Sequence, residues 1–404
     1  MVSNKRAYEH ERENTRPRPR PKVAQERVEQ REPAANVINR GSIDYTMCFV
    51  TVVLVLIGIV MIFSASYHQA AMRGFGTFHF VRQQAIFASA GFLVMYIMAN
   101  INYRLLVKTG WLLYFISSVM LVYVALFGVV VGGARRWIEL PIIGRFQPSE
   151  VMKVAVIFVI AFLVFRDRRT LDTWKGFFYA SGIVGFAVSL VLLGRSLSVS
   201  LIITIIGMGM IFAASPHIWR FVVMGGAAAG GLVMYLTVLS EDFRGERVNA
   251  WLDPFAFPLG VGYQTIQSLY AIASGGLFGL GIGESRQKSF IPEPQHDMIF
   301  AIIAEELGFA GSAMILALFG LLIWRGIMAA IHAADMFGAM VATGIVLMIA
   351  SQTIINVAVV TNTIPNTGMP MPFISYGGTS LLVSMFLVGV LLNISRYHKD
   401  TGGA

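Results

Sequence analysis

The chain has 404 residues, of which 56% are hydrophobic and only 13% charged, and it carries a formal net charge of +9 at pH 7. With a mean hydropathy of +0.68 and repeated apolar runs long enough to cross a bilayer, this composition excludes a soluble enzyme and predicts a polytopic membrane protein. The single cysteine, Cys48, lies inside an apolar run, which excludes a disulfide within the chain and a cysteine metal site.

Residues 1–40 differ from the rest, because they are charged, contain proline and have almost no large apolar side chains. Such a segment cannot bury enough surface to fold alone, so it predicts a disordered basic tail. The alternation of Arg and Pro from Arg16 to Lys22 favours either an extended basic arm near anionic lipid or a plain solvated tail. The tail lacks the apolar centre of a cleavable signal peptide, so we expect the mature protein to keep it.

Apolar runs of about twenty residues predict an all-α polytopic fold with about ten transmembrane helices. The runs fall near Tyr45–Ser66, Phe80–Ala99, Trp111–Gly132, Met152–Phe165, Phe177–Leu193, Leu197–Ala214, Phe221–Ser240, Met298–Ile323, Phe337–Val360 and Ser380–Ile394. Basic residues gather in the connections on one side: the N-terminal tail, Arg104, Lys108, Arg166–Arg169, Lys175, Arg220, Arg325, Arg396 and Lys399. Because positive loops remain in the cytoplasm, we expect both termini there, including a short tail of residues 397–404.

The connections on the opposite side are longer and richer in distinctive polar residues. They are Gly132–Lys153, the hinge at Gly194–Ser196, a large extracellular loop over residues 241–297, and Thr361–Gly378. A loop of more than about fifty residues is uncommon unless it has a function. Within it, the pattern of Tyr263–Ser274 predicts a helix whose apolar face lies along the membrane surface.

One carboxylate in this loop stands out as a catalytic candidate. Glu293, His296 and Asp297 directly precede the apolar run that begins at Met298. A carboxylate at the mouth of a membrane helix is costly to desolvate, so a chain that keeps one is expected to use it. Partial burial also raises its pKa and makes it a better proton acceptor near neutral pH. Asp297 is therefore the first candidate for a catalytic base; the alternative is a helix N-cap, and both roles can coexist.

Four outward segments resemble the signatures of the SEDS family, named for shape, elongation, division and sporulation, which includes FtsW, RodA and SpoVE. They read GARRWIELPIIGRFQPSEVMK (Gly133–Lys153), RVNAWLDPFAFPLGVGYQTIQSLYAIASGGLFGLGIG (Arg247–Gly283), IPEPQHDMIFAIIAEELGF (Ile291–Phe309) and PNTGMPMPFISYGGTSLL (Pro365–Leu382). The resemblance covers the chain after its first forty residues and implies that residues 41–396 form a ten-helix membrane domain. Four ordered blocks with specific polar positions are a far stronger signal than one glycine-rich block.

The resemblance implies a peptidoglycan glycosyltransferase that polymerises lipid II into glycan strands at the outer face of the bacterial cytoplasmic membrane, in division or sporulation. There the C4 hydroxyl of the acceptor sugar attacks the anomeric carbon of the donor, and undecaprenyl diphosphate leaves. This reaction needs a base and positive charge near the diphosphate. Asp297 matches the essential loop aspartate of the family. Relatives more often read Thr-Asp-Phe here, so His296 either hydrogen-bonds Asp297 or is an incidental loop histidine.

The resemblance also assigns candidate substrate contacts. Arg136, Lys153 and Arg247 match basic family positions, and fixed cations suit a diphosphate; the competing explanation is snorkelling at the membrane interface. Glu293 and His296 are candidates because they flank Asp297. Ser375 and Tyr376 begin a run of small and hydroxyl residues, for which substrate contact and close helix packing are both open.

Four further polar residues are expected to support the site. Glu150 either favours the dipole of a helix N-terminus or binds a cation. Glu305 and Glu306 lie inside a predicted span, where they must face the bundle interior, hydrogen-bond the loop, pair with a cation or join helices. Asn356, within another span, is expected to bond to a neighbouring helix.

One segment departs from the family pattern. Where many relatives carry an acidic motif resembling Glu-Pro-Asp-Leu-Gly-Thr, residues 194–199 read Gly-Arg-Ser-Leu-Ser-Val. The acidic position is lost, so a cation-binding role for this segment is in doubt. Arg195 then either supplies positive charge directly, or the change affects only packing.

The sequence contains no nucleotide-binding loop or serine hydrolase elbow, so we expect no nucleotide or organic cofactor. Mg²⁺ or Mn²⁺ is chemically reasonable at a diphosphate, with the metal ligands left open. The resemblance implies a class B penicillin-binding protein as the transpeptidase partner, besides lipid II, membrane lipid and other division or sporulation proteins; no nucleic acid is expected. Two alternatives remain open: a lipid II flippase, and a non-catalytic division scaffold.

Overall fold

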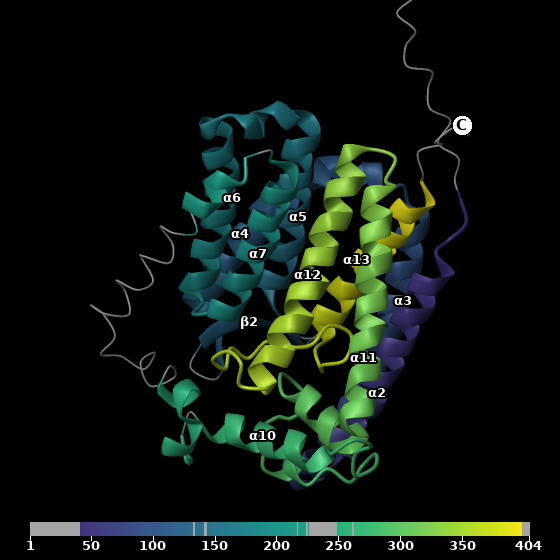
Figure 1. Ribbon diagram of the computed structural model, residues 1–404, viewed down its shortest axis with the longest axis vertical. Helices are drawn as coiled ribbons and strands as arrows, with labels where there is room; N and C mark the ends of the chain where they lie inside the picture. The colour runs from purple at the N-terminus through teal and green to yellow at the C-terminus, as the bar shows by residue number, and fades with distance from the viewer. Residues whose placement is uncertain are drawn as a thin grey trace, which may run out of the picture. The chain divides into compact units, whose positions relative to one another are not determined.

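Long apolar helices make up most of the fold (Figure 1). The computed structural model describes residues 41–131, 134–140, 144–215, 217–223, 225, 249–260 and 262–397. Within these residues, nine helical stretches are long and apolar enough to cross a membrane. They are α2 (Tyr45–Met72), α3 (His79–Asn100), the joined η1 and α4 (Tyr103–Phe127), α5 (Pro148–Arg166), α6 (Trp174–Leu193), α7 (Leu197–Ala214), α11 (Ile299–Ile331), α12 (Met336–Val360) and α13 (Gly378–Arg396).

These helices confirm the predicted all-α, multi-pass membrane fold. They coincide with nine of the predicted spans, and the remaining span, Phe221–Ser240, falls mostly outside the described residues. The predicted N-terminal tail, residues 1–40, lies outside them, as does the predicted C-terminal tail, residues 397–404, apart from Tyr397. Shorter helices complete the described chain: η2 (Arg168–Asp172), η3 (Pro254–Ala256), α10 (Tyr263–Gly275) and η4 (Gln287–Ser289).

Three of the spanning helices form the centre of the bundle. The most apolar windows of α5, α12 and α13 are 78%, 67% and 72% buried, against 28% for α3 and for the α4 stretch. The outer helices therefore present large apolar side chains outward, as expected where the surrounding solvent is lipid. Figure 1 shows α12 between the α4–α7 group and α11.

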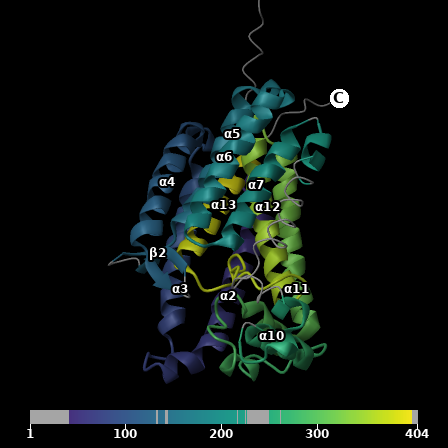
Figure 2. The same cartoon turned by 90° about the vertical axis from the view of Figure 1, so that its left-hand side faces the viewer.

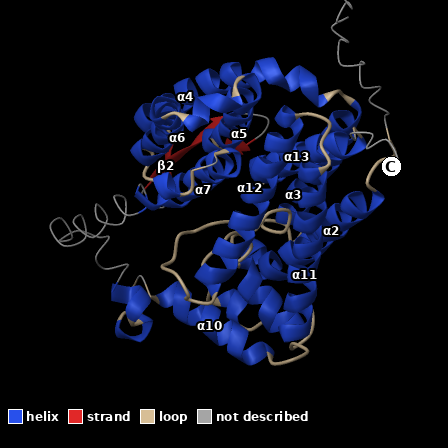
Figure 3. Cartoon of the chain, turned by 45° about the horizontal axis from the view of Figure 1, so that its top comes forward, coloured by secondary structure: helices blue, strands red, loops and turns tan. Residues whose placement is uncertain are grey.

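A small antiparallel sheet interrupts the helical fold between α4 and α5 (red in Figure 3). It consists of β1 (Val129–Val131), β2 (Ala134–Leu140) and β3 (Gly144–Phe146), in the order β1-β2-β3. Val129 pairs with Trp137 on one side of β2, and Ile138 pairs with Phe146 on the other. The predicted span Trp111–Gly132 is therefore too long at its end, since α4 stops at Phe127 and β1 follows, while β2 and β3 lie in the predicted loop Gly132–Lys153. Strands this short carry too few alternating positions to be recognised from the sequence.

The helix predicted at Tyr263–Ser274 is present as α10, and it lies at one end of the bundle (Figures 1 and 2). Its buried residues include Ile266, Ser268 and Ala271, and it packs mainly against α11. The loop that follows α10 enters a break in α11, where Gly308 has a non-helical backbone with a φ of 67°.

Backbone hydrogen bonds close this break from both sides. The carbonyls of Glu305 and Glu306 accept from the N–H groups of Leu280 and Gly281, each at 3.0 Å. The N–H groups of Phe309 and Ala310 donate to the carbonyls of Gly276 and Leu277, at 2.9 and 3.0 Å. A broken helix is tolerated inside a membrane protein only where the freed backbone groups are satisfied in this way. The first turns of α11 are thus tied to the loop that leads to Asp297.

Candidate functional site

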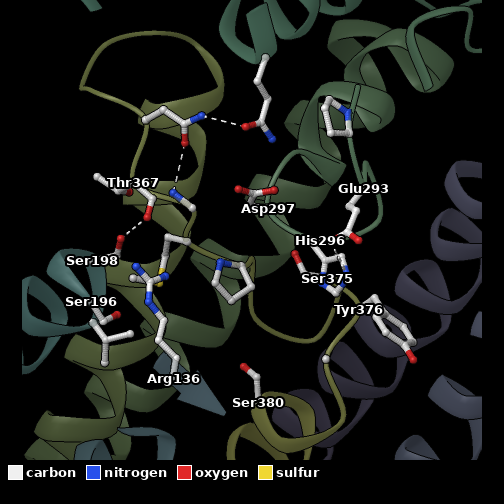
Figure 4. A pocket seen from close by; sticks show the side chains of 18 of the residues that line it. Arg136, Ser196, Ser198, Glu293, His296, Asp297, Thr367, Ser375, Tyr376 and Ser380 are labelled. Atoms are coloured by element: carbon white, nitrogen blue, oxygen red, sulfur yellow. Dashed lines mark hydrogen bonds and ion pairs between the residues drawn. The ribbon is translucent and has the colours of Figure 1, made fainter. Parts of the chain in front are cut away.

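A cavity of about 560 Å³ lies where β2, the first turn of α7, α10 and the connections 292–297 and 366–380 meet (Figure 4). Most of the candidate residues that are described line it: Arg136, Glu150, Glu293, His296, Asp297, Ser375 and Tyr376. These residues come from sequence blocks more than two hundred positions apart, so the fold brings the predicted polar segments to one place.

Asp297 lies at the junction of the large loop and α11. The helix begins at Ile299 with Met298 as its N-cap, and no side chain caps it. The backbone carbonyl of Asp297 accepts a 2.7 Å hydrogen bond from the side-chain amide of Asn356 in α12. Gly368 packs against the carboxylate, since a Cβ added to this glycine would lie 3.3 Å from Oδ2 of Asp297. Asn356 therefore holds the backbone of Asp297, and the carboxylate lies against Gly368 at the cavity wall.

The environment of Asp297 favours proton uptake. Loss of solvent around the carboxylate raises the pKa of Asp297 above its ordinary value. His296 and the backbone N–H groups of Asp297 and Met298 oppose this effect without cancelling it. A carboxylate with a raised pKa is a better proton acceptor at neutral pH than an ordinary aspartate.

His296 joins Asp297 to other charged groups of the wall. Its Nε2 lies 3.8 Å from Oε2 of Glu293, and Nη1 of Arg73, the residue after α2, lies 3.4 Å from the other carboxylate oxygen of Glu293. Its ring meets the ring of Tyr376 edge-on, with centroids 5.2 Å apart. Burial lowers the pKa of His296, while Glu293 and Asp297 act in the opposite direction. The imidazole is thus favoured in its neutral form beside the carboxylate of Asp297.

Ser375 and Tyr376 line the cavity and are also held by protein contacts. The hydroxyl of Tyr376 donates to the side-chain oxygen of Gln83 in α3, and its N–H donates to the carbonyl of Gln295 at 2.8 Å. The hydroxyl oxygen of Ser375 accepts from the N–H of Met371 at 2.8 Å. Both interpretations of this segment, cavity contact and close packing, have a structural basis.

The basic candidates are placed differently from one another. Arg136, on β2, lines the cavity, and its Nη2 donates to the carbonyl of Arg195 at 2.6 Å. Lys153 is 1% exposed, and its Nζ lies 2.8 Å from Oε2 of Glu150, so it supports the wall from behind and does not line the cavity. Arg247 lies outside the described residues.

Glu305 and Glu306 hold the loop that fills the break in α11. Hydrogen bonding to this loop was one of the roles expected for them. Glu305 accepts from the hydroxyls of Ser274 and Ser285 and from the N–H groups of Arg286 and Gln287. Glu306 accepts from the hydroxyl of Ser64 in α2 and lies 3.7 Å from Nζ of the buried Lys288. Glu306 is therefore paired with a cation, which was one of the open alternatives. The cation is Lys288, which the sequence did not single out.

The contacts of Asn356 and the position of Arg195 differ from the simplest expectations. Asn356 was expected to bond to a neighbouring helix, but its amide donates to the loop carbonyls of Asp297 and Met369 instead, at 2.7 and 2.6 Å. The expected helix contact is replaced because the backbones of both loops approach α12 closely enough for their carbonyls to reach this amide. Arg195, in the segment that departs from the family pattern, is exposed and does not line the cavity, whereas Ser196 and Ser198 do.

The described residues do not offer a metal cage. Among them, no group of three or more His, Cys, Asp or Glu side chains is placed to hold a metal ion. Of the cavity carboxylates, Glu150 is paired with Lys153 and Glu293 with Arg73. The described residues therefore do not form a metal cage built from protein ligands alone.

Comparisons with known proteins agree with this architecture. The model of the cell cycle protein family FtsW/RodA/SpoVE matches residues 45–400. Stage V sporulation protein E of Bacillus subtilis (strain 168) is 43% identical over 366 residues, which cover 89% of this chain and 99% of that protein. A probable peptidoglycan glycosyltransferase FtsW of Geobacter sp. (strain M18) is 37% identical over 356 residues, which cover 87% of this chain and 96% of that protein.

Solved structures show the same fold. A chain from "Structural coordination of polymerization and crosslinking by a peptidoglycan synthase complex" superimposes with a TM-score of 0.75 at 25% identity, covering 88% of this chain and 98% of that chain. The rod shape determining protein RodA of Thermus thermophilus superimposes with a TM-score of 0.65 at 23% identity, covering 88% and 97%. The chain belongs to the FtsW/RodA/SpoVE family of cell cycle proteins.

Proposed function

We propose that this protein is a peptidoglycan glycosyltransferase that polymerises lipid II into glycan strands, with Asp297 as the general base. The observation that carries the proposal is the position of Asp297 on the wall of a cavity where burial raises its pKa. Relatives named as probable peptidoglycan glycosyltransferases support the reaction class.

In the proposed reaction, the C4 hydroxyl of the acceptor sugar gives its proton to the carboxylate of Asp297. The oxygen then forms a bond to the anomeric carbon of the donor, and the bond from that carbon to the diphosphate breaks. The electron pair of the broken bond leaves with undecaprenyl diphosphate. The proton on Asp297 finally passes to solvent, while burial favours the neutral form of His296 beside it.

The departing diphosphate needs positive charge. Arg136 lines the cavity, and a guanidinium can hold two phosphate oxygens at once. Arg247 remains a second candidate from the family resemblance. Lys153 acts through Glu150, whose charge it balances at the cavity wall. Mg²⁺ or Mn²⁺ is chemically suited to a diphosphate, but none of the reaction steps proposed above involves a metal ion.

The location and partners follow the same proposal. The basic connections favour cytoplasmic termini, which would put the cavity at the outer face of the cytoplasmic membrane. A class B penicillin-binding protein is the proposed partner that crosslinks the new strand, and the likeness to a chain from a peptidoglycan synthase complex supports it. Other division or sporulation proteins are proposed as further partners, and the similarity to stage V sporulation protein E favours the sporulation branch.

The proposal is tested with purified full-length protein, its transpeptidase partner and labelled lipid II, assayed for glycan polymer. We expect polymer from the parent and none from Asp297→Asn, which keeps the shape of the side chain and loses the base. Asp253→Asn is the matched control, because Asp253 is in the same loop and caps η3 without lining the cavity. Equal polymer from the parent and Asp297→Asn would refute the assignment of the base.

A further inference from the structure

The first turn of α7 forms part of the cavity wall. Ser196, Ser198 and Val199 line the cavity, and α7 continues for 18 residues from Leu197. The first N–H groups of an α-helix have no partner within the helix, and the helix dipole places partial positive charge there. Ser196 is the N-cap, and its side chain makes no capping hydrogen bond to this turn. The end of α7 that faces the cavity is therefore suited to an anion.

Two hydroxyl groups beside this turn support the same conclusion independently. Ser196 is 3% exposed, and among the described residues its hydroxyl has no hydrogen-bond partner. The hydroxyl of Thr367 is buried at the same wall and likewise has no partner in the described chain. The two segments are joined, because the hydroxyl of Ser198 donates to the carbonyl of Thr367. Buried polar groups nearly always have partners, so two such hydroxyls at one cavity wall indicate a place for a ligand.

The charges around this wall also favour an anion. Arg136 reaches the cavity next to α7, where its guanidinium contacts the carbonyl of Arg195, the residue before Ser196. The nearby carboxylate of Glu150 is balanced by Lys153 at 2.8 Å. Figure 4 shows Arg136, Ser196, Ser198 and Thr367 on one side of the cavity, and Glu293, His296 and Tyr376 on the other. Glu293 therefore lies away from α7, whereas the carboxylate of Asp297 lies against Gly368, the residue after Thr367.

We propose that the first turn of α7, the hydroxyls of Ser196 and Thr367, and Arg136 form an oxyanion subsite that binds the phosphate groups of a diphosphate. The subsite rests on the proposed function, because it receives the diphosphate that leaves the donor sugar. Arg136 and Ser196 lie across the cavity from His296, and the carboxylate of Asp297 lies between these two sides. Neutral hydroxyl and N–H donors bind such an anion together with a single guanidinium.

The test measures binding of inorganic pyrophosphate to the full-length protein in phosphatidylcholine nanodiscs by isothermal titration calorimetry. We expect Ser196→Ala and Thr367→Val each to weaken binding roughly tenfold, because each removes one hydrogen bond to a charged group. Thr367→Ser keeps the hydroxyl and should retain the parent affinity. Thr204→Val is the matched control, since Thr204 is in the same helix and its hydroxyl donates to the carbonyl of Ser200, away from the cavity.

Two kinds of outcome would overturn the proposal. One is a pyrophosphate measurement that does not depend on the hydroxyls: either the parent, Ser196→Ala and Thr367→Val bind with equal affinity, or the parent does not bind at all. The other is loss of pyrophosphate binding by the parent in phosphatidylglycerol nanodiscs, which would assign the subsite to a phospholipid headgroup.

The binding measurement requires no turnover, so it tests the diphosphate subsite separately from the role of Asp297 as the base. Asp297→Asn should bind pyrophosphate at least as tightly as the parent, because it removes a negative charge from the cavity. If Asp297→Asn forms polymer while Ser196→Ala loses binding, the proposed base fails and the subsite stands. If Asp297→Asn forms no polymer and Ser196→Ala binds normally, the subsite fails and the base stands.

Discussion

The side-chain amide of Asn356 donates a 2.7 Å hydrogen bond to the backbone carbonyl of Asp297 and a 2.6 Å hydrogen bond to the carbonyl of Met369. Asn356 is fully buried in α12, so one central helix holds both the loop that carries Asp297 and the loop that contains Met369. The position of Asp297 thus depends on a residue that does not line the cavity.

We predict that Asn356→Leu lowers glycan polymerisation by about tenfold to a hundredfold, because a displacement of about 1 Å at a catalytic group has an effect of that size. Two buried carbonyls also lose their donor, which should lower the thermal unfolding temperature. Thr353→Val in the same helix is the control, since its hydroxyl bonds only within α12. Parent-like activity of Asn356→Leu would show that this hydrogen bond does not position Asp297.

The raised pKa of Asp297 predicts a gain of stability when its charge is removed. A group whose pKa is raised in the folded state stabilises the fold fully below its unfolded pKa of about 3.9, and this contribution is lost as pH rises through the folded pKa. Asp297→Asn should therefore melt at a higher temperature than the parent at pH 7. The difference should shrink as pH is lowered toward about 4.

Glu139→Gln is the control for this prediction, because Glu139 is half exposed, paired with Arg145 and does not line the cavity. It should show no gain in melting temperature at pH 7. The same pKa predicts that polymerisation by the parent falls as pH drops through the folded pKa of Asp297, since only the ionised carboxylate accepts a proton. A melting temperature of Asp297→Asn equal to the parent at all pH values would contradict the raised pKa.

The buried pair of Lys288 and Glu306 predicts a strong penalty for removing one partner. Their charged atoms lie 3.7 Å apart, and both side chains are almost completely buried. Lys288→Met should destabilise the protein by about 3–5 kcal/mol, because it leaves a buried carboxylate without its cation. The double variant Lys288→Met with Glu306→Gln should recover much of that loss. Additive losses in the double variant, measured by thermal unfolding, would argue against the pair.

The break in α11 predicts a different response at two glycines of the same helix. A Cβ at Gly308 would lie 2.3 Å from the backbone nitrogen of Gly279, and its φ of 67° strains any other residue. Gly308→Ala should therefore destabilise the protein by about 1–3 kcal/mol. Gly320→Ala, which meets nothing within 4 Å, should be neutral or slightly stabilising. Equal unfolding temperatures of the two variants would contradict the tight packing at Gly308.

Much of this architecture could be predicted from the sequence, because membrane spans and long polar loops leave strong signals in composition. The cluster around Asp297 was also visible, since its polar residues directly precede an apolar run. The ion pair of Lys153 with Glu150 could have been expected from the spacing of three residues on a helix.

Other features depend on contacts between distant segments. The amide of Asn356 meets loops 59 and 13 residues away along the chain. The hydroxyls of Ser196 and Thr367 share a wall although they come from different connections. A glycine inside an apolar run gives no sign that a loop enters the helix there, as one does at Gly308. Tertiary packing, which no local pattern records, decides all three.

The central claim is that Asp297 performs polymerisation and does not serve transport. The most direct test reconstitutes the parent and Asp297→Asn with the transpeptidase partner in liposomes that contain labelled lipid II. Polymer and transbilayer movement of lipid II are then measured in the same sample. We expect Asp297→Asn to lose polymer while any lipid movement equals that of the parent. Normal polymer from Asp297→Asn, with lipid movement lost, would contradict a catalytic role for Asp297 and favour a flippase.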